Sequence, residues 1–136
     1  MTTEITTIDE YDNDYQGEMF LLNTFGSNPE NAKTVYNATN NAVALNEYMG
    51  VPIVVAGVIM DRGTRSNRNG GEAQPCINTY IVDTEGRAYY SQSAGVARGI
   101  AKIASLTDNF SGAPVTIEIG ERKLANGNSL KVVNWI

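Results

Sequence analysis

The segment Val51–Met60 constrains the fold more than any other part of this sequence. Its residues, VPIVVAGVIM, are almost all apolar and rich in β-branched side chains, which predicts a strand buried on both faces. Gly57 lies inside this strand, and a glycine in such a place often marks a bulge or a sharp bend. We therefore expect a long, curved strand that serves two sides of a closed sheet.

Hydrophobic periods predict the elements that follow this strand. Ser93 is a good N-cap, and Val96, Ile100 and Ile103 then fall on one face of a helix that ends before Asp108. Alternating segments bounded by turn residues predict four more strands, at residues 77–82, 87–92, 115–119 and 130–136.

The order of these elements is strand, strand, strand, helix, strand, strand. A five-stranded barrel with one helix between its third and fourth strands has this layout, which is the OB-fold. The predicted fold class is thus mainly β, an OB-fold barrel. An open sheet with a helix packed on one face contains the same elements and stays open as an alternative.

The first 50 residues precede the predicted barrel. Residues 1–17 are rich in Asp, Thr and Tyr and show no hydrophobic period, so we expect an acidic, disordered arm. Residues 18–136 are expected to form a single OB-fold domain with an N-terminal extension to about residue 50. Within this extension, Met19–Phe25 is predicted to add a strand, and Pro29 to open a helix that runs to Tyr48.

Two targeting signals are missing from the sequence. No apolar run approaches the roughly 20 residues that a membrane-spanning helix needs. The N-terminus has neither the basic region nor the apolar core of a secretory signal. We therefore expect a cytoplasmic protein without membrane contact.

The residue types that most enzymes use are scarce. The chain has no histidine and one cysteine, Cys76, so the commonest metal ligands and general base are missing. Cys76 precedes a strand pattern and is expected to be a half-buried packing residue. Glycine motifs for phosphate binding or nucleophile elbows do not occur, and Asp61, Asp83 and Glu85 have no spacing that brings them together. We expect no enzyme, no metal site and no cofactor.

Positive charge is concentrated in two loops, although the net charge of the chain is −5. In an OB layout, oligonucleotides lie between the loop joining strands one and two, here residues 61–71, and the loop joining strands four and five, here residues 120–129. The acidic residues are concentrated elsewhere, with eight of them against one lysine in residues 1–50. Together with Arg87 on strand three, the basic residues of these loops are the expected phosphate contacts: Arg62, Arg65, Arg68, Arg87, Arg122 and Lys123.

The face between the two loops carries aromatic residues. Ile77 and Ile81 fall on one side of their strand and are assigned to the core, so Asn78 and Tyr80 are expected to project outward. Tyr89 and Tyr90 are adjacent, and one of the two should also face outward. Stacking of a base on an aromatic ring is worth about 1–3 kcal/mol and tolerates any sequence, which predicts a groove for single-stranded nucleic acid. Trp135, by contrast, is expected to anchor the core.

Short motifs in this sequence also resemble a known family. The chain is similar, from about Tyr36 onward, to the small single-stranded-DNA-binding proteins of phages and mobile elements of Gram-positive bacteria. The resemblance implies an OB-fold that coats single-stranded DNA during phage-type replication in the cytoplasm of a host cell, and it leaves replication proteins as partners and a homo-oligomer open. The motifs that carry it are Asn37–Ala42, Leu45, Gly50, Tyr80–Tyr90, Ser91–Ser93 and Pro114–Val115.

Two other function classes stay open at this point. A structural or assembly protein of a virion would have the same β-rich, acidic, Thr- and Asn-rich composition. An OB-fold that prefers RNA would use the same stacking interactions. Charge, aromatic residues and predicted topology together favour sequence-independent binding of a single-stranded nucleic acid, and the resemblance implies that this strand is DNA.

Overall fold

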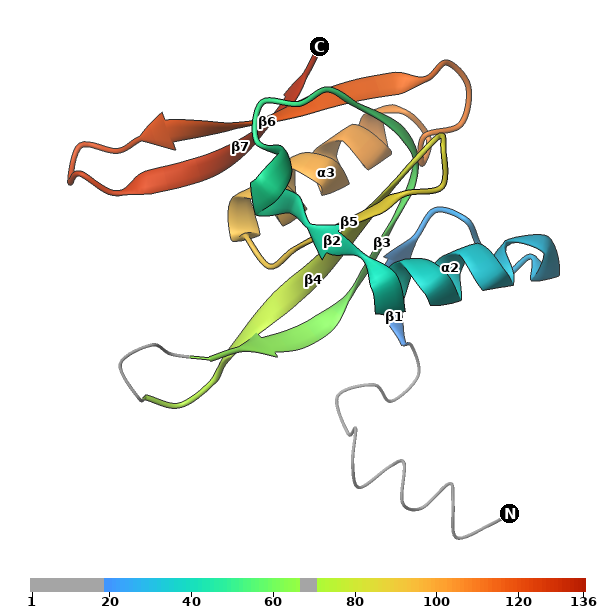
Figure 1. Ribbon diagram of the computed structural model, residues 1–136, viewed down its shortest axis with the longest axis horizontal. Helices are drawn as coiled ribbons and strands as arrows, with labels where there is room; N and C mark the ends of the chain where they lie inside the picture. Colours follow the sequence, from blue (N-terminus) through green and yellow to red (C-terminus); the bar gives the residue numbers. More distant parts are fainter. Residues whose placement is uncertain (1–18, 67–70) are drawn as a thin grey trace, which may run out of the picture.

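The computed structural model describes residues 19–66 and 71–136. The acidic arm expected at 1–17 and the predicted contact Arg68 lie outside the described residues. No helix in the described part is long and apolar enough to cross a membrane. The described chain is mainly β and forms one sheet of seven strands with helices beside it: β1 (Phe20–Asn23), α2 (Pro29–Asn41), β2 (Val43–Ala44), the 3-10 helix η2 (Leu45–Tyr48), β3 (Ile53–Arg65), β4 (Gln74–Asp83), β5 (Ala88–Ser91), α3 (Ala94–Leu106), β6 (Val115–Lys123) and β7 (Ser129–Trp135) (Figure 1).

Strand β3 curls the sheet into a half-barrel. Its start pairs with β6 and the rest of it pairs with β4, and β1 pairs with it near Met60. The register with β4 shifts between Val55 and Gly57, which confirms the bend predicted at this glycine. A Cβ on Gly57 would lie 2.5 Å from Cζ of Phe25, so only glycine lets that ring pack here. The resulting strand order is β2-β5-β4-β3-β6-β7.

Helix α3 packs inside the curl and forms the main core with the strands. The Ser93 Oγ accepts a hydrogen bond from the backbone N–H of Val96 (3.3 Å), which confirms the predicted N-cap. Val96, Ile100 and Ile103 are buried, as their spacing predicted. Gly95 and Gly99 bring the helix against β7, and a Cβ on Gly95 would collide with the backbone carbonyl oxygen of Lys131.

The N-terminal extension differs from the single long helix that was expected. Helix α2 ends at Asn41 rather than Tyr48, since its Asn-rich end has low helix propensity. The chain then becomes extended at β2, which pairs in parallel with β5 through Val43 and Tyr89. Leu45 follows in η2 and is buried in the main core. Residues 42–48 therefore extend the sheet and help to fill the core.

Helix α2 covers the outer face of the sheet. Its buried residues Val35 and Ala38 pack with Ile59, Tyr80 and Val82 in a second apolar cluster, separate from the core around α3. In Figure 1, α2 lies beside β1 on the side of the sheet away from α3. The strands next to it are thus covered on both faces.

Two side chains at the ends of the core strands differ from expectation. Trp135 is 50% exposed, because it lies at the end of the edge strand β7, so the prediction that it anchors the core is wrong. Ile77 is 39% exposed, since β3 and β4 continue as a hairpin past the core, whereas Ile81 is buried as predicted. Cys76 is half-buried, as expected.

The hydroxyl of Thr79 is a buried polar group without a partner among the described residues. Leaving such a group unsatisfied costs about 1–3 kcal/mol, and valine has nearly the shape of threonine. We expect Thr79→Val to raise the free energy of unfolding by about 1 kcal/mol, measured by urea denaturation. Thr84→Val, at an exposed position, is the control and should change it by less than about 0.5 kcal/mol. A loss of stability in Thr79→Val would show that the hydroxyl has a partner in solution.

Candidate functional site

A wide cleft lies where the half-barrel is open. Among the described strands, β5 and β7 are not paired with each other, and the β3–β4 and β6–β7 hairpins project to the same side of the molecule (Figure 1). Between them is a cleft of about 700 Å³, bounded by the end of β5, the first residues of α3 and β7. A volume of this size is in the range of known ligand sites.

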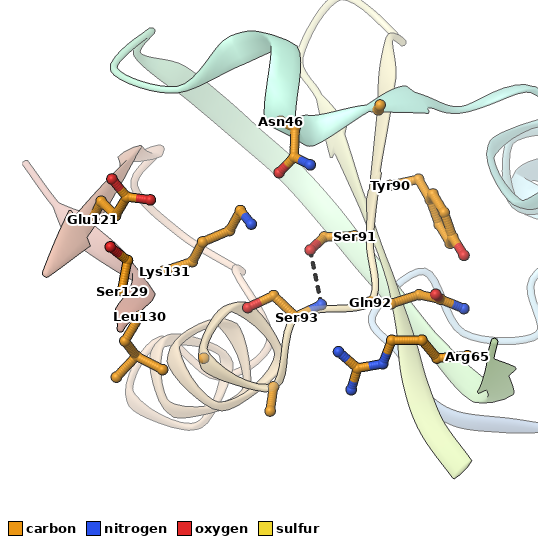
Figure 2. Close-up of a pocket in the computed structure, with 13 residues that line it drawn as sticks. Asn46, Arg65, Tyr90, Ser91, Gln92, Ser93, Glu121, Ser129, Leu130 and Lys131 are labelled. Atoms are coloured by element: carbon orange, nitrogen blue, oxygen red, sulfur yellow. Dashed lines mark hydrogen bonds between the residues drawn. The ribbon is translucent and has the colours of Figure 1, made fainter. Parts of the chain in front are cut away.

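Two cations enter this cleft from opposite walls. Arg65, at the end of β3, and Lys131, on β7, both extend toward its centre (Figure 2). In the part of the chain that the structure describes, neither side chain has a hydrogen-bonded or ionic partner. Glu121 is the cross-strand neighbour of Lys131 and is the one acidic residue among the described residues that line the cleft. The charge of the cleft is therefore positive.

The floor between the two cations is polar. Asn46 from η2 points into the cleft, and the hydroxyl of Ser91 accepts a hydrogen bond from the backbone N–H of Ser93 (3.1 Å) (Figure 2). Ala94 and Gly95, the first residues of α3, also line the cleft, where the partial positive charge of a helix N-terminus adds to that of the cations. This arrangement can hold a polyanion such as a sugar-phosphate backbone.

Next to the cleft, a hydrogen-bonded network covers the outer face of β3, β4 and β5. The Oδ1 atom of Asn78 accepts hydrogen bonds from Gln92 Nε2 (3.0 Å) and from the Tyr90 hydroxyl (3.3 Å). The Asn78 Nδ2 atom donates to Asp61 Oδ1 (2.8 Å), and Gln92 Nε2 also donates to the backbone carbonyl of Thr64 (3.1 Å). This network holds Gln92 in place beside Arg65.

Burial raises the pKa of Asp61 within this network, and the hydrogen bond from Asn78 offsets part of the shift. A raised pKa in the folded state means that folding favours the protonated carboxyl. The contribution of Asp61 to stability is therefore fullest at acidic pH and is lost as the pH rises through the raised pKa. Near neutral pH, the burial of the Asp61 carboxylate therefore lowers the free energy of unfolding.

Two of the three tyrosines considered as candidates for base stacking are buried. Tyr80 faces away from the core as predicted, but it is only 8% exposed, because α2 packs over that face of the sheet. Tyr89 is 4% exposed and lies edge-on against the ring of Tyr48, with 5.1 Å between centroids. Burial raises the pKa of Tyr89, and the hydrogen bond that its hydroxyl donates to Asp83 (3.0 Å) acts in the same direction. Tyr89 is thus the inward member of the Tyr89 and Tyr90 pair, of which one was expected to face outward, whereas the expectation of an accessible Tyr80 ring is wrong because α2 covers it.

Tyr90 is the one predicted stacking residue that borders the cleft. Its ring projects to the opposite side of β5 from the Ser91 hydroxyl (Figure 2) and is half-buried. It packs against Tyr80 with 5.4 Å between ring centroids and a tilt of 35°. The Tyr90 ring therefore lies on the outer face of β5, beside the cleft.

The predicted cations are divided between several places. Arg62 and Arg65 are exposed at the end of β3, and of these two Arg65 lines the cleft. Arg122 and Lys123 are exposed at the end of β6, opposite Leu130 and Ser129 on β7. Arg87 is exposed on the β4–β5 side of the sheet, where it donates a hydrogen bond to the Tyr89 hydroxyl (3.5 Å). The structure thus brings Arg65, but not Arg87, to the cleft.

Sequence reasoning missed several residues that line the cleft. Lys131 lies in a strand that was predicted correctly, and strand alternation places it opposite Glu121, which follows the buried Ile119 on the same face. That alternation was a usable signal. Asn46 had none, because the strand and 3-10 turn that position it were predicted as helix. Ser91 and Ser93 were named in a motif of the family resemblance, and Ser93 as a helix cap, but neither was predicted as a site residue.

Comparison of this chain with protein-family models, with curated proteins and with solved structures finds no match.

Proposed function

We propose that this protein binds single-stranded DNA without sequence preference, in the cleft between β5 and β7. The observation that carries the proposal is that Arg65 and Lys131 face each other across a polar cleft of about 700 Å³, and that neither has a partner among the described residues. Phosphate contacts of this kind supply sequence-independent affinity. Coating of DNA during replication in a cell, with replication proteins as partners, is the role that fits such binding.

We also propose that the half-barrel is an OB-fold. The order of β3, β4, β5, α3, β6 and β7 supports this, as does the pairing of β3 with both β4 and β6 around a bulge. In that fold, oligonucleotides lie across the second and third strands, between the first and last hairpin loops. The cleft and the adjoining outer face of β4 and β5 have this location.

A bound strand would cross the end of β5. Its phosphates would contact Arg65 and Lys131, and Arg122 and Lys123 would flank the path on the β6–β7 hairpin. One base would rest on the accessible part of the Tyr90 ring. A duplex presents its bases paired and stacked, so this contact selects for a single strand.

Titration with nucleic acids tests the function directly. The protein is titrated with oligo(dT), oligo(U) and duplex DNA at several salt concentrations, with the fluorescence of Trp135 and the tyrosines as the readout. Oligo(dT) should quench saturably, and the logarithm of affinity should fall by about 0.7 per phosphate contact for each tenfold rise in salt. Tighter binding of oligo(U) would assign an RNA role. No binding to any of the three would favour a structural role in a virion and end the proposal.

Replacing Tyr90 tests the base contact. We expect Tyr90→Ala to weaken oligo(dT) binding roughly 10-fold without changing the salt dependence, since stacking on one base is worth about 1–3 kcal/mol and involves no counterion. Tyr36→Ala is the matched control, because Tyr36 is 68% exposed on α2 and does not line the cleft. Equal affinities for Tyr90→Ala and Tyr36→Ala, with both folded by circular dichroism, would remove Tyr90 from the site.

A further inference from the structure

A second groove continues from the cleft on the other side of Arg65. It has a volume of about 400 Å³ and lies between the β3–β4 hairpin and the first half of α3. Arg65, Gln92 and Ala94 line both the cleft and this groove, so the two spaces adjoin. None of the sequence motifs discussed above falls on the α3 wall of the groove.

The groove combines an apolar lining with two cations. Apolar side chains from both walls line it, and Ile77 among them is 39% exposed. Arg98, on the exposed side of α3, stands across from Arg65, and in the described part of the chain it has no hydrogen-bonded or ionic partner. None of the described residues that line the groove is acidic. The apolar lining residues are Met60, Pro75, Cys76, Ile77, Ala94, Ala97 and Ala101.

We propose that this groove is a second nucleotide subsite, which takes the base and phosphate that follow those held in the cleft. The inference rests on the function proposed above and extends its site. The apolar lining accepts the face of a base, and Arg98 together with Arg65 accepts the phosphate. Lys102 lies one helical turn beyond Arg98 on α3, where it extends the positive surface in the same direction.

Both chemical features of the groove favour a nucleotide over other ligands. A free phosphate would leave exposed Ile77 and Pro75 in water, and an apolar molecule would leave two guanidinium groups without counter-charge. A nucleotide matches both, because its base is apolar on its faces and its phosphate is ionised. Since Arg65 borders both spaces, one phosphate on Arg65 can join the nucleotides on either side.

The test is a length series of oligo(dT), from dT4 to dT16, bound to the full chain carrying Arg98→Ala. We expect the substitution to weaken binding of the longest oligonucleotide roughly 5-fold and to lower its salt slope by about 0.7, as for one lost contact to a single strand. The shortest, which fills the cleft alone, should bind as tightly as it does to the unsubstituted protein. Lys33→Ala is the control, because Lys33 is exposed on α2 and lines neither space.

The single cysteine gives an independent readout without substitution. Cys76 lines the groove and is half-buried, so its rate of reaction with a thiol reagent should fall when dT16 binds and stay unchanged with dT4. Equal effects of Arg98→Ala at every length, or none at any length, would overturn the second subsite while the proposed function stands. Failure of the unsubstituted protein to bind any oligonucleotide would instead overturn the proposed function itself.

Discussion

Replacing both cleft cations, in Arg65→Ala/Lys131→Ala, is expected to reduce affinity for oligo(dT) about 100-fold at low salt. The two side chains approach the cleft from β3 and β7 and have no partners in the described structure, so their charge is available to a ligand. Loss of two phosphate contacts should also reduce the salt slope by about 1.4. Fluorescence titration at four salt concentrations measures both quantities.

The matched control for this pair is Lys33→Ala/Arg87→Ala. It removes the same two residue types, and both line a separate groove between α2 and the β4–β5 turn. We expect the control to lower affinity less than about 3-fold, through the change in net charge alone. If the control weakens binding as much as the cleft pair, the nucleic acid does not lie in the cleft. The Lys33 and Arg87 groove would then replace it as the candidate site.

Substitution of Gly95 by alanine is expected to destabilise the protein by about 2 kcal/mol. On helix propensity alone, alanine would stabilise α3 by about 1 kcal/mol. The added Cβ, however, would collide with the carbonyl oxygen of Lys131, which belongs to the β7 backbone and cannot rotate away. Either α3 or β7 must shift. Urea denaturation measures the loss, and oligo(dT) affinity should fall as well, because β7 carries Lys131.

Ala101→Gly is the control for the backbone contact. Ala101 is exposed on the same helix, so glycine there should cost about 1 kcal/mol through propensity only. The two substitutions exchange the same pair of residues in opposite directions, and we expect both to destabilise. A stabilised Gly95→Ala protein would show that β7 is not fixed against α3 in solution.

The elements after Gly50 could be predicted because each has a strong local pattern. The β-branched run around Gly57 predicted β3 and its bulge. Ser93 and the spacing of the apolar residues that follow it predicted α3 and its N-cap. Strand β5 and the first six residues of β6 alternate between buried and less buried positions. For these segments, local propensity and tertiary packing favour the same structure.

The burial of each face of the sheet was predicted less well, because it depends on which distant elements pack against that face. The alternation in β4 placed Tyr80 and Ile81 on opposite faces, and this is correct. It could not show that α2, some 40 residues earlier in the chain, packs on the outer face and buries Tyr80. The short segment at Val43 and Ala44, which pairs with β5, is likewise too short to carry a period.

The residues that line the cleft were predicted only in part, again because tertiary packing decides which side chains meet there. Arg65 was identified because arginines cluster in its loop, whereas Lys131 and Arg98 are single cations in a strand and a helix. Such residues become candidates only when the pairing of β6 with β7 and the packing of α3 are known. Whether Arg62, Arg122 and Lys123 contact nucleic acid stays a prediction.

The curvature of β3 has a mechanical consequence for the opening of the molecule. In the described sheet, β3 is the sole strand that pairs both with β4 and with β6, so within the sheet the β3–β4 and β6–β7 hairpins are joined through this strand, near the bulge beside Gly57. A ligand that moves the two hairpins apart must bend β3 and disturb the packing of α3 on β7. The separation of the two hairpins thus depends on the bulge beside Gly57, which a ligand in the cleft does not touch.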